Sequence, residues 1–300
     1  MRHLTDRSTL LLTSSLILPL LCGFGGHRPG TLSPVALGMG DATIAAGSGT
    51  VALVSNPAGL AHVRQHAMEL GLSREPLNRT TSFYVAQADS TSPSGVAAGL
   101  SYGYHTGAAV AGITRSGSDF RAGAALGLGG ETGRLYFGGS ARWLDLEFAQ
   151  EGKDTRTVTG WTGDLGVTLA LAGKVRLGAA WRNLVVLDAD ETPGRLAAGA
   201  AVVFESFILS GEGSWGIDGG GLAWRGGAGL LVADTLQLRA GYSWDKNRGV
   251  NGAPVQNAHV GLGWRHEAVV MDGGLAVDLD EPSTVIFGFS MTFQLPYTLG

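Results

Sequence analysis

The sequence predicts an all-β fold, a transmembrane antiparallel β-barrel of about fourteen strands with an N-terminal plug segment in its lumen. Three observations support this prediction. Period-2 alternation of apolar and polar residues recurs over most of residues 67–294. The connections between the alternating segments are short and long in turn. No apolar run reaches the roughly 18 residues that a membrane helix needs, so a membrane protein with this sequence must cross the bilayer as a barrel.

The alternation divides the chain into fourteen predicted strands. It is clear in the last strand, where Phe287, Phe289 and Phe293 share one face. Gly288 and Thr292 lie on the opposite face. A soluble β-sandwich alternates in the same way, so the alternation alone does not decide between the two folds. The predicted strands are residues 67–74, 80–88, 95–105, 119–129, 134–147, 159–171, 174–183, 194–204, 206–215, 222–232, 235–244, 258–266, 268–277 and 283–294.

The connections favour the barrel over the sandwich. Those that follow the even strands, from the second to the twelfth, are short, and one of them is the single residue Glu205. Short periplasmic turns and longer outer loops are the rule for outer-membrane barrels. An even number of strands then puts both ends of the wall on the periplasmic side. The long connections follow strands three, five, seven and eleven, and are predicted at residues 106–118, 148–158, 184–193 and 245–257.

Aromatic residues near the strand ends give a second indication of a barrel. In an up-and-down arrangement, six tryptophans fall near the outer rim, and two further aromatic residues mark the inner rim. Indole rings favour the membrane–water interface because they are apolar with one hydrogen-bond donor. The alternative is a set of unrelated core tryptophans. The predicted interface aromatics are Trp143, Trp161, Trp181, Trp215, Trp224 and Trp244 at the outer rim, and Trp264 and Phe293 at the inner rim.

The chain is predicted to have three parts: residues 1–26, 27–65 and 66–300. The first is predicted to be a signal peptide, because a basic start precedes an apolar run from Ser8 to Leu21 and small residues follow. The second is small and apolar without strand alternation, and is predicted to be the plug. The third is the barrel. Cys22, the only cysteine, falls in the predicted signal, so the mature chain would lack a thiol.

Composition excludes nucleic acid as a partner and gives glycine a structural role. The net charge of −4 and the lack of a basic patch with interleaved aromatics argue against nucleic-acid binding. The 49 glycines exceed the usual share of about 7 per cent, and many of them occupy alternate positions within the strands. Glycine at such positions marks places where a wall curves or where a plug approaches it closely.

Two short motifs stand in the predicted plug. Gly38 and Gly40 allow a backbone to pass close to another surface. Pro57 fixes its own φ and pushes Asn56 toward an extended conformation, and the Asn56 side chain can cap a turn. The segment therefore suits a compact plug that gates the lumen, and the alternative is a plain surface turn before the first strand. The predicted plug motif and gate comprises Gly38, Met39, Gly40, Asn56, Pro57, Ala58 and Gly59.

On these motifs the chain resembles the FadL superfamily of outer-membrane β-barrel proteins and the related PorV/PorQ proteins. The matching runs are Gly38-Met39-Gly40-Asp41-Ala42 and Asn56-Pro57-Ala58-Gly59. Residues 163–166 and 175–184 also look like a central hairpin of PorV-like sequences. The resemblance implies location in the outer membrane of a Gram-negative bacterium, in contact with outer-membrane lipid.

The resemblance implies two alternative functions. One is a FadL-like channel for passive transport or binding of hydrophobic small molecules, such as long-chain fatty acids, gated by the plug motif. The other is a PorV-like scaffold or shuttle of a type IX-like secretion system, with secreted proteins as partners. The chain is short for a FadL-type channel and closer in length to PorV-like proteins.

The predicted lumen face is rich in arginine, and two interpretations stay open. One is a basic corridor or a carboxylate-binding site for an amphipathic acid. The other is a salt-bridge network that ties the wall to the plug, since a polar interior is the default in barrels. The predicted lumen-lining residues are Arg121, Arg134, Arg142, Asp164, Arg176, Arg182, Arg195, Arg225, Arg239 and Arg265.

No motif predicts an enzyme, a cofactor or a metal site. The run from Gly211 to Gly216 fits the dinucleotide-binding spacing, but it lies at the end of a predicted strand with no helix after it. His62 and His66 are four residues apart without an adjacent Glu base or a third ligand. The one Gly-x-Ser-x-Gly run, from Gly99 to Gly103, lies within a predicted strand and is not a strand-to-helix elbow. We therefore expect no catalytic residues.

Overall fold

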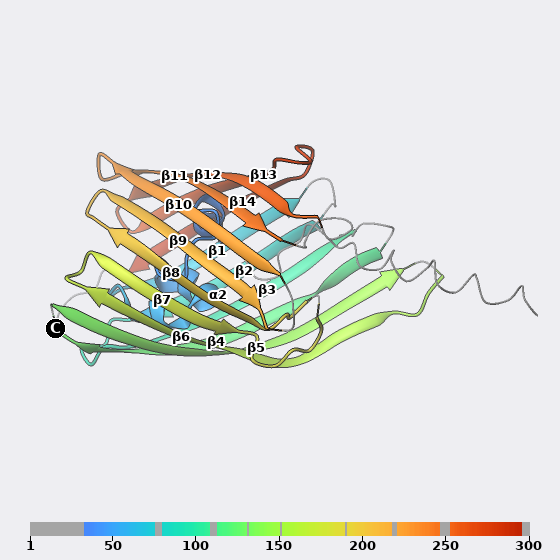
Figure 1. Ribbon diagram of the computed structural model, residues 1–300, viewed down its shortest axis with the longest axis horizontal. Helices are drawn as coiled ribbons and strands as arrows, with labels where there is room; N and C mark the ends of the chain where they lie inside the picture. The colour runs from blue at the N-terminus through green and yellow to red at the C-terminus, as the bar shows by residue number, and fades with distance from the viewer. Residues whose placement is uncertain are drawn as a thin grey trace, which may run out of the picture.

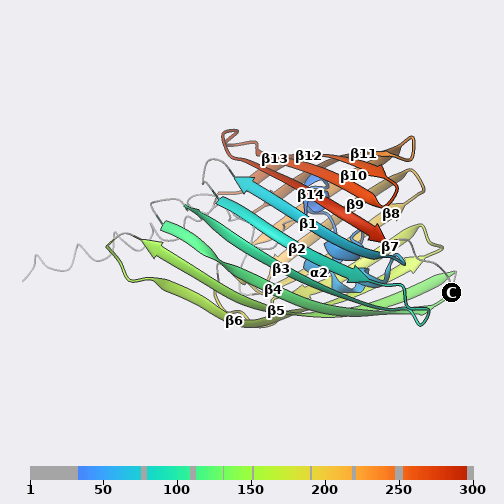
Figure 2. The same cartoon turned by 180° about the vertical axis from the view of Figure 1, so that it is seen from behind.

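A computed structural model describes residues 33–75, 80–108, 113–130, 132–150, 152–189, 191–217, 221–246 and 253–295. Fourteen strands in these residues form a closed antiparallel barrel, in which chain neighbours pair and β1 also pairs with β14 (Figures 1 and 2). This confirms the predicted fold class. The strands are β1 His66–Glu75, β2 Thr80–Asp89, β3 Val96–Ala108, β4 Ile113–Gly129, β5 Gly133–Gln150, β6 Arg156–Leu171, β7 Val175–Arg182, β8 Arg195–Val203, β9 Phe207–Gly216, β10 Leu222–Val232, β11 Leu236–Asp245, β12 Val255–His266, β13 Val269–Asp278 and β14 Val285–Leu295.

Two connections that were predicted to be long are largely strand. The β3–β4 ladder continues to the pair Ala108–Thr114, and the β5–β6 ladder continues to the pair Phe148–Arg156. The predicted loops at 106–118 and 148–158 are therefore wrong in extent. A hairpin satisfies its own backbone hydrogen bonds, so its ladder can run on where the apolar alternation that marks the sequence fades. The β5–β6 hairpin consequently extends past the other strands at the end of the barrel where β5 finishes and β6 begins (Figures 1 and 2).

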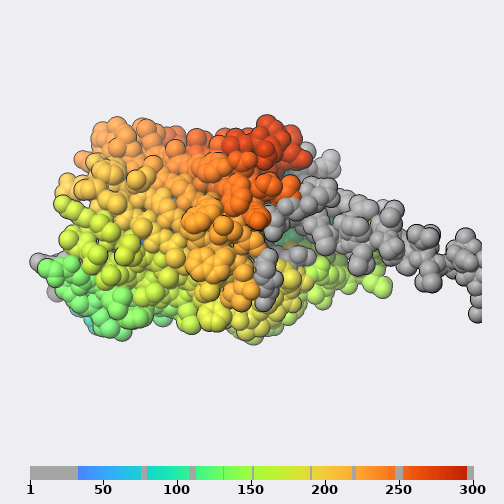
Figure 3. All heavy atoms as spheres, viewed as in Figure 1, coloured from blue at the N-terminus to red at the C-terminus, as the bar shows by residue number. Residues whose placement is uncertain are grey.

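Alternate residues of each strand face the lumen and the outside. In β1, Glu69 and Ser73 are buried, whereas Met68 and Leu70 are exposed. Exposed large apolar side chains recur on the outer face of most strands. The strands coloured yellow and orange form a continuous wall on the side seen in Figure 3. An apolar exterior on a closed barrel is the surface that a bilayer solvates. Among the described residues, no helix is long and apolar enough to cross a membrane.

Three short helices lie inside the barrel: α1 Pro34–Gly38, α2 Gly49–Ser55 and the 3₁₀ helix η2 Pro57–Ala61 (Figures 1 and 2). Two of them begin with proline, whose missing N–H has no cost in a first helical turn. The apolar core lies between these helices and the wall. Leu53 and Leu60, which are fully buried, pack with Ala88, Ala97 and Ala125 of the strands.

Candidate functional site

The segment of residues 33–65, called the plug here, sits directly on the backbone of the wall. A methyl group built on Gly138 would lie 2.3 Å from backbone atoms of Pro57 and Ala58. One built on Gly241 would lie 2.3 Å from the nitrogen of Gly40. A ring of lumen-facing glycines meets the plug in this way, with each added methyl group within 3.3 Å of a plug atom, and we call it the glycine belt: Gly99, Gly123, Gly138, Gly166, Gly178, Gly227, Gly241, Gly261, Gly274 and Gly288.

Asn56 of the predicted gate motif joins the plug to the wall. Its side-chain nitrogen donates to the carbonyl oxygen of Ile44 at 2.7 Å and to the hydroxyl of Thr168 on β6 at 3.1 Å. Its side-chain oxygen accepts from the backbone nitrogen of Ala58 at 3.2 Å. Asn56 is therefore a fully bonded, buried anchor between two parts of the plug and one strand.

The first plug motif makes its turn against the opposite wall. Gly40 and Asp41 both have positive φ, of 64° and 61°, which turns the chain after α1. Gly38 meets Gly261 of β12, where the methyl groups that either would gain lie about 3 Å from the other backbone. Both motifs named from the sequence thus contact the wall, on different strands.

Polar contacts complete the seat of the plug. The backbone nitrogen of Ile44 donates to Glu212 of β9 at 2.9 Å, and the carbonyl oxygen of Leu37 lies 2.8 Å from His259 Nδ1 of β12. Thr50 donates to Glu69 of β1. Nothing in the surroundings of Glu69 in the chain points to a contact with a threonine of the plug.

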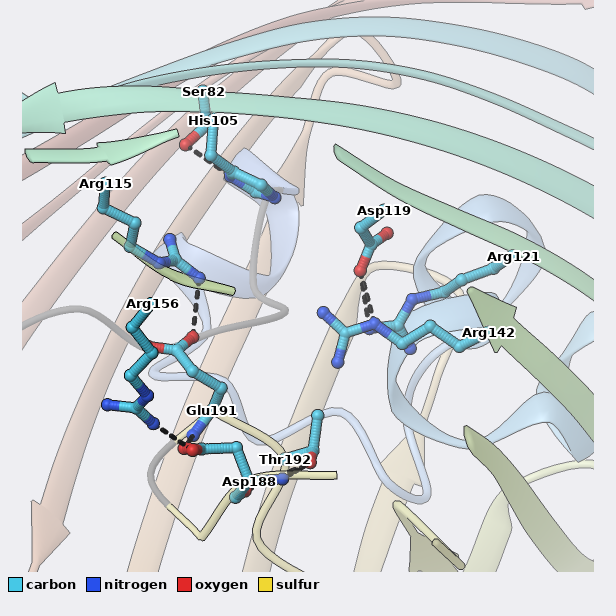
Figure 4. A network of polar contacts seen from close by, with 10 residues as sticks. All are labelled: Ser82, His105, Arg115, Asp119, Arg121, Arg142, Arg156, Asp188, Glu191 and Thr192. Carbon is cyan, nitrogen blue, oxygen red and sulfur yellow. Dashed lines mark hydrogen bonds and ion pairs between the residues drawn. The ribbon is translucent and has the colours of Figure 1, made fainter. Parts of the chain in front are cut away.

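The outer half of the lumen, on the side of the plug that faces the β5–β6 hairpin end, carries buried ion pairs (Figure 4). Arg142 bonds to Asp119. Arg121 lies 3.5 Å from Asp119 and 3.3 Å from Asp164. These four side chains, from β4, β5 and β6, are each no more than 6% exposed. With so little water around them, the pairs hold neighbouring strands together.

A second group of ion pairs lies on β8 to β11. Arg225 pairs with Glu212 at 3.2 Å, and Asp245 lies 3.6 Å from Arg195 and 3.9 Å from Arg225. Arg182 is opposite Arg195 in the ladder, and among the described residues it has no carboxylate within ion-pair distance. The two groups together are called the outer network. It contains five arginines and four carboxylates: Arg121, Arg142, Arg182, Arg195 and Arg225, with Asp119, Asp164, Glu212 and Asp245.

The connection between β7 and β8, residues 183–194, is fastened to the outer end of the barrel, and we call it the outer loop. Glu191 bonds to Arg115 of β4 at 2.7 Å, and Asp188 bonds to Arg156 of β6 (Figure 4). The fully buried Thr192 accepts from the backbone nitrogen of Asp188 at 3.0 Å. These contacts come from strands on one side of the barrel mouth.

Beneath the outer loop lies an apolar cluster on lumen-facing positions. Leu144 and Leu146 of β5 are at most 1% exposed and pack with Val158 of β6. Leu187 of the outer loop and Phe148 pack against them. Sequence reasoning missed this cluster, because the strand residues alternate as any strand does, and Leu187 ends a run of four apolar loop residues that does not show which of them turns inward.

The inner half of the lumen, on the other side of the plug, holds fewer ion pairs. Arg239 pairs with Asp272 at 2.7 Å. Arg134, Arg176 and Arg265 also occupy lumen-facing positions, and none of them has a carboxylate within ion-pair distance in the described part of the chain. The ten predicted lumen-lining residues therefore fall into two groups with the plug between them: Arg121, Arg142, Asp164, Arg182, Arg195 and Arg225 outside, and Arg134, Arg176, Arg239 and Arg265 inside.

The predicted interface aromatics all face outward. Trp143 is opposite Trp161, with ring centroids 5.2 Å apart, five pairs before the outer end of the β5–β6 ladder. Trp224 is opposite Trp244, next to the outer end of the β10–β11 ladder. Trp264 lies at the inner end. Their role at the bilayer interface stays a prediction. The positions on the outer face are Trp143, Trp161, Trp181, Trp215, Trp224, Trp244, Trp264 and Phe293.

The described residues contain no group of three or more His, Cys, Asp or Glu side chains that could hold a metal ion. Most polar groups of the lumen are arginines, carboxylates, hydroxyls and imidazoles that bond to one another, and two buried serines, Ser82 and Ser243, lie 2.9 Å from the rings of His105 and His259. Their arrangement can bind and orient a ligand.

Comparison with solved structures places the fold. The monoaromatic hydrocarbon channel CymD matches with a TM-score of 0.69 and 13% identity, over 91% of this chain and 100% of that one. The toluene transporter TbuX of Ralstonia pickettii matches with a TM-score of 0.65 and 13% identity, over 90% and 100%. A FadL homologue of Pseudomonas aeruginosa matches with a TM-score of 0.62 and 11% identity, over 90% and 99%.

No family model matches the chain, and no curated protein matches it. The closed barrel with an apolar exterior is a membrane-spanning structure of the bacterial outer membrane. Strand number, closure and structural neighbours agree, and the chain has the fold of the FadL-like outer-membrane barrels.

Proposed function

We propose that the chain is an outer-membrane channel that binds and passes hydrophobic small molecules, such as long-chain fatty acids or similar compounds. The observation that carries the proposal is the apolar cluster of Leu144, Leu146 and Val158 on lumen-facing positions at the outer mouth. A barrel that conducts water and ions has a polar interior, so buried apolar side chains there favour an apolar ligand. Two of the structural neighbours, a hydrocarbon channel and a toluene transporter, support the same class of ligand.

The plug is the gate in this proposal. At the ten glycines of the belt the plug packs directly on the wall, so we expect that passage requires part of the plug to move. Asn56 and Pro57 hold the point where α2 and η2 meet β5 and β6. Loss of the Asn56 bonds would free this point while most of the belt contacts remain.

Uptake measurements test the proposal. A host strain that lacks its own channel for these compounds would express the full chain, and uptake of a radiolabelled long-chain fatty acid and of toluene would be followed. We expect the chain to raise uptake of at least one compound, and Asn56→Ala to change its rate. Thr114→Ala is a matched control, since Thr114 is exposed on the protruding β3–β4 hairpin. Uptake equal to that of the empty strain for both compounds would reject the channel.

The PorV-like alternative is favoured by one observation, the contact of the plug with strands all around the lumen, which suits a barrel that conducts nothing. In that case the chain would serve secreted proteins through its outer surface. Deletion in the native host would then leave uptake unchanged and trap exported proteins in the periplasm, which is the opposite pair of results.

A further inference from the structure

Four side chains form a cluster against the inner side of the plug. The ring of Tyr136 on β5 meets the ring of His62, next to η2, edge-on with centroids 4.7 Å apart. The guanidinium of Arg134 lies 5.7 Å from the Tyr136 ring centroid. Arg176 on β7 places Nη1 3.5 Å from His62 Nδ1. We call this group the inner cluster, and it joins two cations to an aromatic ring.

The ladder register puts the two arginines in one row. Arg134 is opposite Ala170 of β6, and Ala170 is opposite Arg176 of β7. Since neighbouring strands are about 4.8 Å apart, the Cα atoms of the two arginines are about 10 Å apart. Only the methyl group of Ala170 stands between them on the lumen face, so two guanidinium groups flank a small side chain.

The positive charge of the inner cluster faces no carboxylate in the part of the chain that the structure describes, and none lies within ion-pair distance of Arg134 or Arg176. Arg134 Nε is a buried donor without a hydrogen-bond partner. Burial and the neighbouring Arg176 lower the pKa of His62 to about 3, so its ring is neutral, and its one N–H, at Nδ1, donates to the carbonyl oxygen of Gly47 at 3.0 Å. A buried donor without a partner is costly, and an anion that accepts from Arg134 Nε removes this cost.

The surroundings of the two arginines are apolar. Ala58, Tyr136 and Ala170 form a buried cluster, with Ala61 packed beside them. A ligand that fits both features carries one anionic group and a small apolar body. Inorganic phosphate has the charge without the apolar body, and an alcohol has the body without the charge.

We propose that the inner cluster binds an organic carboxylate, with its head group at Arg134 and Arg176 and its apolar part against Tyr136 and Ala170. The site lies where a molecule that has passed the plug reaches the periplasmic half of the lumen. Its place on a transport route rests on the proposed function. Binding is measured without transport, so the site and the channel can fail separately.

Calorimetric titration of the purified full chain in detergent tests the site, with hexanoate, hexan-1-ol and inorganic phosphate as probes. We expect hexanoate to bind at least tenfold more tightly than either of the others. Arg176→Gln and Arg134→Gln should each weaken hexanoate binding about tenfold, as the loss of a charge-assisted hydrogen bond predicts. Arg265→Gln is the matched control, since it removes an equally unpaired lumen arginine on the far wall and should change affinity less than twofold.

Three results would overturn the site. Hexanoate that binds no better than hexan-1-ol would show that the arginines recognise no anion. Equal weakening in Arg265→Gln would show a general positive field in place of a site. If phosphate bound as tightly as hexanoate, the site would recognise an anion alone, and the proposed contact with an apolar part of the ligand would be wrong. Each variant would first be checked for the heat-dependent gel mobility of a folded barrel, and Arg176→Lys, which keeps the charge, should retain more affinity than Arg176→Gln.

Discussion

Most arginines in the outer half of the lumen pair with carboxylates, whereas most of those in the inner half have no carboxylate partner among the described residues; Arg182 and Arg239 are the exceptions. In the outer half, Arg121, Arg142 and Arg225 all pair with carboxylates of neighbouring strands. In the inner half, Arg134 and Arg176 contact aromatic rings and no carboxylate among the described residues. Paired arginines are committed to the structure of the barrel, whereas unpaired ones are available to a ligand. The difference teaches that the number of arginines in the lumen does not by itself indicate a ligand path. Whether each arginine pairs with a carboxylate decides whether it is structural or free to bind a ligand.

The largest expected effect is on the outer half. Asp119→Asn removes the carboxylate that Arg142 and Arg121 share, and leaves both cations buried. Breaking a buried pair from one side costs about 3–5 kcal/mol, so the free energy of unfolding should fall by that order. Urea unfolding in detergent micelles measures it. Asp145→Asn, on the outward face of β5, is the control. If Asp119→Asn lowers the free energy of unfolding no more than this control does, the outer network does not stabilise the barrel.

The boundary between the halves gives the next effect. Gly138→Leu places a side chain where the backbone of Pro57 and Ala58 lies. Overpacking of this kind costs about 1–3 kcal/mol, and we expect the plug to shift and the barrel to leak. Single-channel conductance in a planar bilayer would detect the leak. Gly139→Leu faces lipid, where an added methyl group meets nothing closer than 3.5 Å, and should conduct like the unaltered chain. Equal conductance in both variants would contradict the idea that the contact between the plug and the glycine belt closes the lumen.

A smaller effect is expected at the outer loop. Glu191→Gln breaks the hydrogen-bonded pair with Arg115, which contributes about 1 kcal/mol at this partly buried position. Local opening of the loop should then increase about fivefold. The rate of limited proteolysis within residues 183–194 measures this opening. Glu147→Gln, exposed on the outward face of β5, should leave the rate unchanged, and a loop that is cleaved no faster in Glu191→Gln would show that the pair does not fasten it.

The smallest effect is expected in the inner half, and it sharpens the comparison most. Arg176→Gln removes a cation that has no carboxylate partner among the described residues, so the free energy of unfolding should change by less than about 0.5 kcal/mol. The same urea titration as for Asp119→Asn provides the value. A loss of several kcal/mol would mean that Arg176 is structural, and the two halves would not differ in kind.

Much of the fold could be predicted from the sequence because alternation is a local property. The strand around Phe287 and Phe289 shows its two faces within a few residues, and its neighbours do the same. The protruding ends of β4 and β5 were not predicted, since hydrogen bonds within a hairpin sustain a ladder where alternation is weak.

The site was less predictable because it depends on register. Arg134 and Arg142 stand on one face of β5, only eight positions apart, and the sequence does not show that the plug lies between their levels. That separation follows from the pairing of each strand with the next. The contacts of Leu187 and of Thr50 depend on loop and plug conformations that no local pattern encodes.

The glycine belt also bears on how the molecule assembles. The plug precedes β1 in the chain. Its backbone meets β10 at Gly227 and β5 at Gly138, and its Pro34 side chain meets β14 at Gly288. A body that fits the wall this closely is hard to thread into a finished cylinder. We therefore expect the plug to be in place before the barrel closes, with β1 and β14 pairing last. The close fit at the glycine belt would then reflect the order of folding, in which the strands assemble around the plug.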